Sequence, residues 1–230
     1  MVTFVSCFYL VNNKHGDSYK KWFNTTLRVN APYVFFGTKE SIDLVTPFRQ
    51  GLPTIFVERN ISDFVTFPFR HKMKTHPVHC PSVELNLVWN EKVFMLRDAA
   101  SVNPFRSEFF AWIDAGICTY RDRPPPLLGI QTTRFLDHHR FNYTASNPYR
   151  PGIGYDSHHV SGTLFVIPVG LLPTIARLYF EKLGELTAIL TDQVVLTHLF
   201  ESNKPLFHRV CDGYGTIFPK FYDVCTSNTR

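Results

Sequence analysis

The first sixty residues show two alternating patterns of apolar and polar positions. Three short apolar runs, rich in β-branched and aromatic residues, predict buried strands. Two segments between them place apolar residues near one helical face and predict helices. Strands that alternate with helices favour parallel pairing in a sheet covered by helices. The predicted strands are 3–11, 32–36 and 54–57, and the predicted helices are 17–29 and 39–49.

The middle of the chain has one clear helix and one clear strand between less regular stretches. Residues 63–81 are irregular and rich in Phe, Pro, His and Lys. Residues 109–113 form an unbroken apolar run that predicts a strand, whereas 121–159 show no periodicity. A loop of that length in a compact domain is usually functional or disordered. The helix is predicted from apolar residues three and four apart, namely Leu85, Trp89, Val93, Leu96 and Ala100.

The last third returns to regular patterns. Residues 162–169 predict a strand, and 192–202 predict a helix that begins with Asp192. Residues 206–210 predict a final strand, followed by an aromatic, glycine-containing segment at 213–222. Another helical face is formed by Leu172, Ile175, Tyr179 and Leu183. One mixed α/β domain over residues 1–230 accounts for all of these patterns.

Composition and charge narrow the class of protein. The chain is 44% hydrophobic, 19% charged and 15% aromatic, which excludes a disordered, collagen-like or coiled-coil protein. No apolar run reaches the roughly 18 residues of a membrane span, and residues 1–11 lack the features of a signal peptide. A net charge of +5 permits anionic ligands, but no Lys/Arg-dense stripe predicts nucleic-acid binding. The five cysteines, widely spaced and without a CxxC, fit reduced thiols.

An aspartate stands at the end of the strand predicted at 109–113. Asp114 is followed by the small residues Ala115 and Gly116. Ligands of open α/β sheets bind beyond the carboxyl ends of the strands, and Mg²⁺ or Mn²⁺ takes carboxylate and phosphate oxygens. Asp114 can therefore approach a metal-bound diphosphate. The alternative interpretation is a turn or cap aspartate that follows a buried strand.

Three further features can contact an anionic substrate. Asp192 and Gln193 begin a helix and can serve as a general base and its polar neighbour, or as a plain N-cap. Lys92 lies at the edge of a helical face, where it either reaches a phosphate or is solvated. The third is an arginine-rich segment, which is either a bidentate anion clamp or a solvated loop: Arg121, Arg123, Arg134, Arg140 and Arg150.

Other chemistries have little support in the sequence. His71, His76, His79 and Cys80 cluster, but a structural zinc site usually has two ligand pairs and only one is present. No GxGxxG, GxxxxGK[ST] or GxSxG motif occurs, so neither a phosphate-cradling loop nor a serine-nucleophile elbow is indicated.

Several short motifs together resemble the HtrL/YibB-type proteins, a family grouped with GT-A-like glycosyltransferases. The resemblance covers about residues 3–222 and is most specific between Trp89 and Gly116. Its motifs are Trp89-x-x-Lys92, Asn103-Pro104-Phe105, Ser107-Glu108-Phe109-Phe110, Trp112-Ile113-Asp114-Ala115-Gly116, Ser161-Gly162, Asp192-Gln193-Val194-Val195-Leu196 and Pro205-Leu206-Phe207.

The resemblance implies a GT-A-like (half-Rossmann) α/β fold with a mainly parallel sheet flanked by helices. It also implies transfer of a sugar from a nucleotide-diphosphate donor, UDP- or GDP-sugar, to a glycan or other hydroxyl acceptor. The alternative is a non-catalytic nucleotide- or carbohydrate-binding module of the same fold. The implied compartment is the cytoplasm, including that of a viral or microbial host cell, or the Golgi lumen. Segment 117–160 is interpreted as an acceptor-binding lid.

The resemblance also implies roles for individual residues. Asp114 stands where GT-A enzymes have Asp-x-Asp, although this chain has Asp-Ala-Gly. A Mn²⁺ or Mg²⁺ ion would be held by Asp114, the diphosphate, waters and His208, or Lys and Arg side chains would replace the metal. Asp192, with Gln193, would be the catalytic base if the enzyme inverts, and would orient substrate if it retains. The implied nucleotide-sugar-binding residues are Tyr9, Val11, Asn13, Lys14, Phe36, Lys92, Asp114, Ala115, Gly116 and Gly162.

Overall fold

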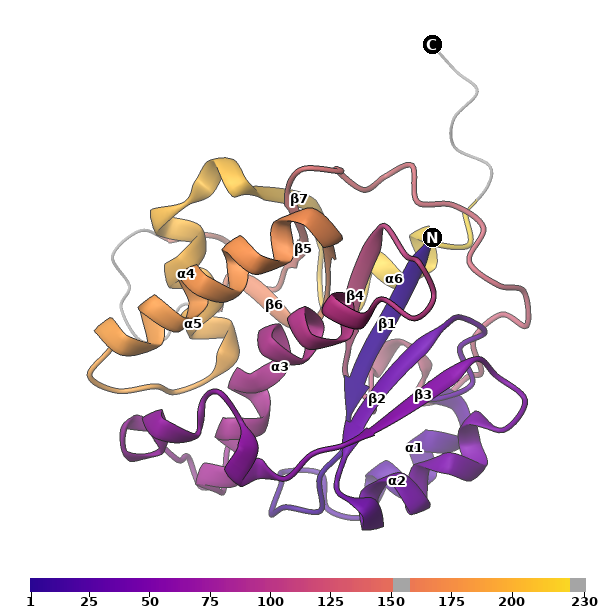
Figure 1. Ribbon diagram of the computed structural model, residues 1–230, viewed down its shortest axis with the longest axis horizontal. Helices are drawn as coiled ribbons and strands as arrows, with labels where there is room; N and C mark the ends of the chain where they lie inside the picture. The colour runs from indigo at the N-terminus through magenta and orange to yellow at the C-terminus, as the bar shows by residue number, and fades with distance from the viewer. Residues whose placement is uncertain (151–157, 224–230) are drawn as a thin grey trace.

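The computed structural model describes residues 1–150 and 158–223, and the strands of this part of the chain form one sheet (Figure 1). The strand order is β3-β2-β1-β4-β6-β5-β7. The strands are β1 (Val2–Cys7), β2 (Tyr33–Gly37), β3 (Thr54–Glu58), β4 (Phe109–Ile113), β5 (Phe141–Ala145), β6 (Val160–Pro168) and β7 (Phe207–Asp212).

Strand direction determines where a ligand site can form. β1, β2, β3 and β4 are parallel, β6 is antiparallel to β4 and β5, and β7 is parallel to β5. Every described strand except β6 therefore ends at the same edge, and β6 begins there. We call this the site edge. The Asp114 amide donates to the Thr163 carbonyl at 3.0 Å, so the end of β4 and the start of β6 meet there.

Two layers of helices cover the sheet and enclose two hydrophobic cores. The helices α3 (Val83–Val102), α4 (Leu172–Glu185) and α5 (Asp192–Ser202) pack on one face. On the other face lie α1 (Ser18–Thr26) and α6 (Ile217–Lys220), with α2 (Lys39–Val45). Figure 1 shows α3, α4 and α5 grouped together, apart from α1 and α2. The mixed α/β class with a mainly parallel, helix-flanked sheet is thus confirmed.

Helix α3 is the central helix of the first layer. It begins where Ser82 accepts a hydrogen bond from the Leu85 amide at 3.2 Å, and it ends at Asn103, which has a positive φ of 41°. Polar residues on its buried side are also satisfied: Tyr179 donates to Asn90 at 2.8 Å. Because polar as well as apolar side chains of α3 are buried, this helix can carry a charged residue into the interior.

Two strand expectations differ from the structure. β1 ends at Cys7, and residues 8–11 continue the apolar run as a loop at the site edge. The segment expected to lack structure at 121–159 contains β5, which pairs with both β6 and β7. Asn142 is buried in β5 and donates to the carbonyls of Asp137 and Arg140 at 2.9 and 2.8 Å. A buried asparagine satisfied by the preceding turn conceals this strand in the apolar pattern.

Helix boundaries differ by smaller amounts. The helix expected at 39–49 is α2 followed by the 3-10 turn Thr46–Arg49, and the irregular stretch after β3 contains the 3-10 turns Ile61–Asp63 and Phe67–Lys72. The segment 213–222 includes the short helix α6. None of the helices in the described ranges 1–150 and 158–223 has the length and apolarity needed to cross a membrane.

Candidate active site

The ammonium of Lys92 joins four elements at the site edge. Its Nζ lies 3.1 Å from Asp114 Oδ1, after β4, and 2.8 Å from Asp192 Oδ2, at the start of α5. It also donates to the carbonyl of Gly162, in β6, at 2.8 Å. Lys92 itself comes from α3 and is only 4% exposed. We call Lys92, Asp114, Asp192 and the Gly162 carbonyl the Lys92 cluster.

Burial and charge pairing act in opposite directions in this cluster. Burial alone would lower the pKa of Lys92, but Asp114 and Asp192 hold that pKa above its usual range. Burial raises the pKa of Asp192, and the Lys92 ammonium opposes that rise. Lys92 is therefore protonated at neutral pH. With both carboxylates ionised, the cluster has one positive and two negative charges, so it is net anionic.

Asp114 is the member of the cluster that faces solvent. Its side chain is 34% exposed, whereas that of Asp192 is 5% exposed. The Trp112 indole donates from Nε1 to Asp114 Oδ1 at 2.8 Å, because residues two apart in a strand share a face. The same oxygen faces Lys92. Trp112 and Lys92 thus fix the orientation of Asp114 through one oxygen, and no residue that the structure describes hydrogen-bonds to the other.

Two glycines permit the close approach of neighbouring side chains. A Cβ on Gly162 would lie 2.9 Å from Asp192 Cγ and 3.0 Å from Gln193 Cγ, closer than real Cβ contacts. A Cβ on Gly116 would lie 2.7 Å from Tyr19 Cε1. Glycine at these positions allows α5 and α1 to pack against the ends of β6 and β4.

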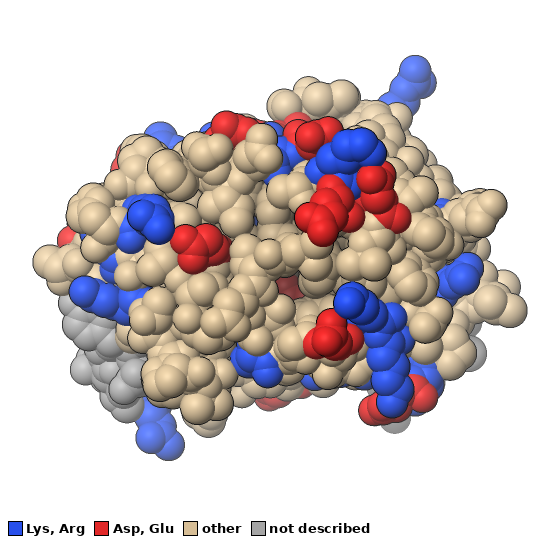
Figure 2. All heavy atoms as spheres, turned by 90° about the horizontal axis from the view of Figure 1, so that it is seen from below, with Lys and Arg blue, Asp and Glu red and all other residues tan. Residues whose placement is uncertain are grey.

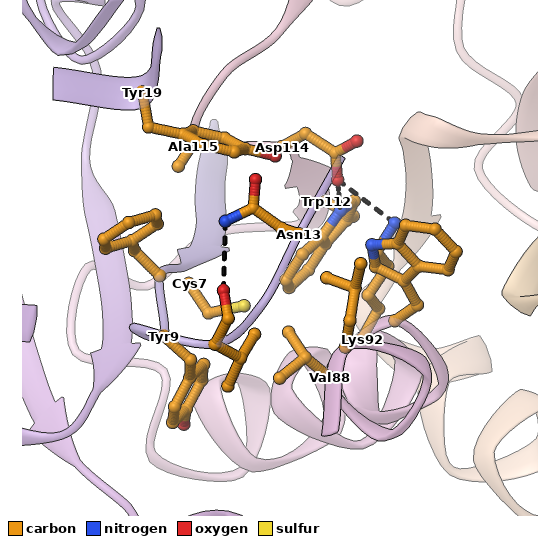
Figure 3. A pocket seen from close by; sticks show the side chains of 13 residues that line it. Cys7, Tyr9, Asn13, Tyr19, Val88, Lys92, Trp112, Asp114 and Ala115 are labelled. Atoms are coloured by element: carbon orange, nitrogen blue, oxygen red, sulfur yellow. Dashed lines mark hydrogen bonds and ion pairs between the residues drawn. The ribbon is translucent and has the colours of Figure 1, made fainter. Parts of the chain in front are cut away.

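A cleft opens beside the Lys92 cluster and encloses about 490 Å³, its open mouth included. The labelled side chains in Figure 3 come from the end of β1 and the loop after it, from α1, from α3 and from the end of β4 with the residues that follow it. Figure 2 views the molecule from below and shows a hollow near the centre of the face, with an acidic side chain recessed in it. The lining residues are Cys7, Phe8, Tyr9, Val11, Asn13, Tyr19, Leu85, Val88, Trp89, Lys92, Trp112, Asp114 and Ala115.

Most of the residues expected from the sequence come together here. Tyr9, Val11, Asn13, Lys92, Asp114 and Ala115 line the cleft, and Gly116, Gly162 and Asp192 adjoin it. Asn13 donates from Nδ2 to the Val11 carbonyl at 3.0 Å (Figure 3), which shapes the loop after β1. Gln193 is half-buried beside Ser146, whose hydroxyl lies 3.4 Å from its Oε1. Lys14 is exposed next to this loop.

Two expected residues lie elsewhere. Phe36 is buried under the Arg59 guanidinium, 4.9 Å from the ring centroid, and lines a separate cavity against the second half of α3. His208 pairs with Asn142 near the start of β7, whereas the site edge lies at the other end of that strand. β7 is also three strands from β4, roughly 14 Å at a spacing of about 4.8 Å per strand. His208 and Asp114 therefore cannot hold one ion together.

The described residues do not form a divalent-cation site by themselves. Mg²⁺ and Mn²⁺ are bound through several oxygens, usually including one or two carboxylates. Within residues 1–150 and 158–223, no three His, Cys, Asp or Glu side chains are grouped so as to hold a metal. Asp114 is one carboxylate, and the Lys92 ammonium occupies one of its oxygens. Asp192 gives an oxygen to the same ammonium. The histidines and cysteine at 71–80 do not form a three-ligand group either.

Some lining residues were not predicted from the sequence. Trp112 could have been identified from the sequence, since a residue two positions before Asp114 in a strand must share its face. Tyr19, Leu85 and Val88 have none, because their helical patterns indicate burial and not a cleft. Burial raises the pKa of Tyr19 to about 12, and the negative charge of Asp114 adds to that rise.

A family model supports the resemblance over the part of the chain that contains the cluster. The family described as bacterial protein of unknown function (HtrL_YibB) matches residues 54–137. The matched stretch includes α3 with Lys92 and β4 with Asp114. The resemblance to HtrL/YibB-type proteins is thus confirmed over that stretch. A search of curated protein sequences gives no match to this chain.

Solved glycosyltransferase structures share the fold. The chain is similar to mouse xyloside xylosyltransferase 1 in its apo form, with a TM-score of 0.50, 10% identity, and coverage of 91% of this chain and 85% of that one. It is also similar to the galactosyltransferase LgtC in complex with donor and acceptor sugar analogs, with a TM-score of 0.52, 12% identity, and coverage of 98% and 80%. For an active-site mutant of LgtC the TM-score is 0.53 and the identity is 11%, with coverage of 98% of this chain and 80% of that one. The fold is therefore that of the GT-A glycosyltransferases.

Proposed function

We propose that this protein is a glycosyltransferase that binds a nucleotide-diphosphate sugar in the cleft at the site edge. The observation that carries the proposal is the Lys92 cluster, which joins the ends of β4, β6 and α5 beside that cleft. Ligands of open α/β sheets bind at this edge. The GT-A fold supports a sugar donor as the ligand. UDP- and GDP-sugars are the donors to test first.

The nucleoside is proposed to lie between the loop after β1 and the start of α3. Tyr9, Val11 and Asn13 form one wall of the cleft, and Val88 and Trp89 form the other. These side chains are mainly apolar and aromatic, with one amide, which suits a flat base that needs few directed hydrogen bonds. Phe36 is left out of this part of the proposal because it lines another cavity.

The sugar and diphosphate are proposed to lie over Asp114, Ala115 and Gly116. Asp114 is the exposed carboxylate of the cluster and is the proposed contact to the donor. Lys92 and Asp192 are buried, so we assign them as positioning residues that hold Asp114 and the start of α5 in place. Gln193 is the more exposed neighbour of Asp192 and is the proposed contact to the reacting sugars.

Transfer moves the anomeric carbon from the diphosphate oxygen to an acceptor hydroxyl. The departing diphosphate gains negative charge, so positive groups near it lower the barrier. If the configuration at the anomeric carbon is inverted, a carboxylate must take the acceptor proton. Asp192 is the candidate, on condition that its contact with Lys92 breaks and its carboxylate reaches the acceptor hydroxyl. If the configuration is retained, Asp192 keeps its positioning role. No step is routed through a metal, because the described residues do not form a metal site by themselves.

The proposed function is tested by donor binding and turnover. A thermal-shift panel of UDP, GDP and their sugars, with and without Mn²⁺, compares wild type with Asp114→Asn. A ligand at 100 times its dissociation constant stabilises the folded state by about 2.7 kcal/mol, which for a chain of this size raises Tm by roughly 5–10 °C. We expect such a shift with one nucleotide family. For the nucleotide sugar the shift should be smaller in Asp114→Asn, because the Asp114 carboxylate is the proposed acceptor for hydroxyl groups of the donor sugar. Sugar release from the matching donor then measures turnover.

A matched control separates the site from general effects of charge removal. Asp43→Asn removes a carboxylate that forms an exposed surface pair with Lys39, away from the cleft. This variant should shift as wild type does. Binding without any sugar release would favour the non-catalytic module, and no shift with any nucleotide would reject the proposed function.

A further inference from the structure

The proposed donor site lacks a visible positive partner for the diphosphate. The Lys92 ammonium is the cation nearest to Asp114, but it is already shared between two carboxylates and a carbonyl. With both carboxylates ionised, the Lys92 cluster is net anionic. A diphosphate brought over Asp114 adds further negative charge to the same place. A second cation at the mouth of the cleft would therefore favour diphosphate binding.

Arg121 is held close to this position by two contacts. Its Nε donates to the Gly116 carbonyl at 2.8 Å, and its guanidinium carbon lies 3.8 Å from the centroid of the Trp22 ring. Both contacts restrict the side chain before any ligand binds. The Nε–H is used by the protein, so the two NH₂ groups are free to form the fork that matches a phosphate.

The neighbours of Arg121 connect it to the cleft. Trp22 packs against Tyr19, with ring centroids 5.4 Å apart, and Tyr19 lines the cleft beside Asp114 and Ala115. Gly116, which anchors Arg121, follows these residues directly. Arg121 therefore lies one residue contact away from the cleft lining, on the side of Tyr19 and Ala115, and we infer that it borders the proposed diphosphate position.

The local charge at this rim is positive. His15 packs on Trp22 with ring centroids 4.9 Å apart. Burial lowers the pKa of His15 to about 4, with Arg121 and Lys14 adding to the effect, whereas Asp114 opposes it. A neutral histidine thus stands beside two permanent cations. The rim is suited to an anion at neutral pH.

We propose that Arg121 binds the diphosphate of the donor and supplies the positive charge that the chain's carboxylates do not provide by holding a metal. This inference rests on the proposed function. Arg121 is a binding residue here, and Trp22 and the Gly116 carbonyl are its supports. Lys14, exposed on the other side of His15, adds charge without directed geometry.

The test compares phosphate-dependent binding with base binding. Titration calorimetry measures UDP, GDP, uridine and guanosine, each in EDTA and in Mn²⁺, against wild type, Arg121→Gln, Arg121→Lys and Arg123→Gln. Arg123 is the matched control because it is exposed two residues along the same segment. Thermal denaturation establishes that each variant is folded. If Arg121→Gln does not fold, Arg121→Lys carries the comparison, since lysine keeps the charge but loses the fork.

We expect one nucleoside diphosphate to bind in EDTA about as tightly as in Mn²⁺. Arg121→Gln should weaken it by about 10- to 100-fold, the usual range for a lost charge-assisted pair. The affinity of Arg121→Lys for the diphosphate should lie between those of wild type and Arg121→Gln, and the affinity of Arg123→Gln should match that of wild type. The free nucleoside should bind all four proteins equally, which a merely structural role for Arg121 would not produce.

Three results would overturn the inference. Diphosphate binding that needs Mn²⁺ and is unchanged in Arg121→Gln would mean that a metal ion, and not Arg121, supplies the positive charge. The proposed function would not be affected by that result. Equal weakening of the nucleoside and of its diphosphate would make Arg121 a structural residue. No nucleoside diphosphate binding under either condition would reject the inference and the proposed function together.

Discussion

At the scale of single residues, the buried Lys92 ammonium pairs with two carboxylates, of which Asp192 is buried and Asp114 faces solvent. Its own side chain is 4% exposed, and its contacts reach β4, β6 and α5. A buried ion pair contributes little net stability compared with a well-packed apolar alternative. Removal of one partner is different, because it leaves an uncompensated charge in the interior.

Lys92→Met should therefore destabilise the protein strongly. We expect a loss of about 3–5 kcal/mol in the free energy of unfolding, measured by urea denaturation at pH 7, because Asp192 is left without its cation. The double variant Lys92→Met with Asp192→Asn should recover part of that loss. Lys39→Met, which breaks an exposed pair with Asp43, should change stability little. Equal effects of the two lysine changes would contradict the role given to Lys92.

His15 gives a pH-dependent prediction at the same scale. Its pKa is about 4 in the folded protein, because burial and then Arg121 and Lys14 disfavour the imidazolium. The unfolded chain takes up a proton near pH 6.5, and the folded chain does so only near pH 4. His15 thus contributes stability that is present above pH 6.5 and is lost as the pH falls toward 4.

An NMR titration of the His15 ring checks this directly. We expect the resonance to shift near pH 4 in wild type, and at a higher pH in Arg121→Gln because one neighbouring cation is removed. Urea midpoints of His15→Gln should vary less between pH 4 and 6.5 than those of wild type. A midpoint near 6.5 in the wild-type ring titration would rule out the buried, cation-flanked environment.

At the scale of elements, the contact between β6 and α5 depends on Gly162. A Cβ at this position would press on Asp192 Cγ at 2.9 Å and on Gln193 Cγ at 3.0 Å. Gly162→Ala should push the first turn of α5 away from β6 and lengthen the Asp192–Lys92 contact. We expect reduced sugar transfer and a lower Tm, measured by donor turnover and calorimetry.

Gly184→Ala is the matched control for that variant. Gly184 lies in α4, and a Cβ there meets nothing within 4 Å. Alanine in a helix is favoured over glycine by about 0.5–1 kcal/mol, so this variant should be more stable and equally active. If Gly162→Ala behaved in the same way, close packing of α5 on β6 would not matter to the site.

The elements also differ in how far their sequence predicts them. β4 lies at 109–113 as the apolar run indicates, and α3 follows the spacing of its apolar residues. β5 could not be found in this way. Its short pattern, Phe-Asn-Tyr-Thr-Ala, includes two polar residues that are fully buried, and the hydrogen bonds of Asn142 depend on carbonyls in the preceding turn and in β6. Such partners are not visible in a local pattern.

The candidate site was predictable to a similar extent. Asp114 could be located because it ends an apolar strand, and Asp192 because it begins a helix. Their meeting through Lys92 could not, since a lysine on a helix edge usually faces solvent. The resemblance implies that His208 helps Asp114 to hold a metal, but the distance between two strand residues across a sheet depends on strand order, which the sequence pattern does not give.

At the scale of the whole molecule, one sheet separates two cores and carries the cleft at one edge. The core under α3, α4 and α5 and the core under α1 and α6 share no helix among the described residues. The cleft draws on both layers, because Tyr19 comes from α1 and Lys92 from α3. A ligand in it therefore contacts groups that are otherwise joined only through the sheet.

Donor binding should for this reason protect three separate segments of the chain from hydrogen exchange. Using the nucleoside diphosphate that gives the thermal shift, we expect slower exchange in the loop after β1 and in the segment from Asp114 to Arg121. The start of α5 should also be protected, through the Lys92 cluster. Exchange slows because local opening would break ligand contacts.

Strand β3, at the far edge of the sheet, should be unchanged and serves as the internal reference. The same experiment on Arg121→Gln should show weaker protection at all three segments together. Protection confined to one wall would mean that the ligand lies outside the cleft between the two layers.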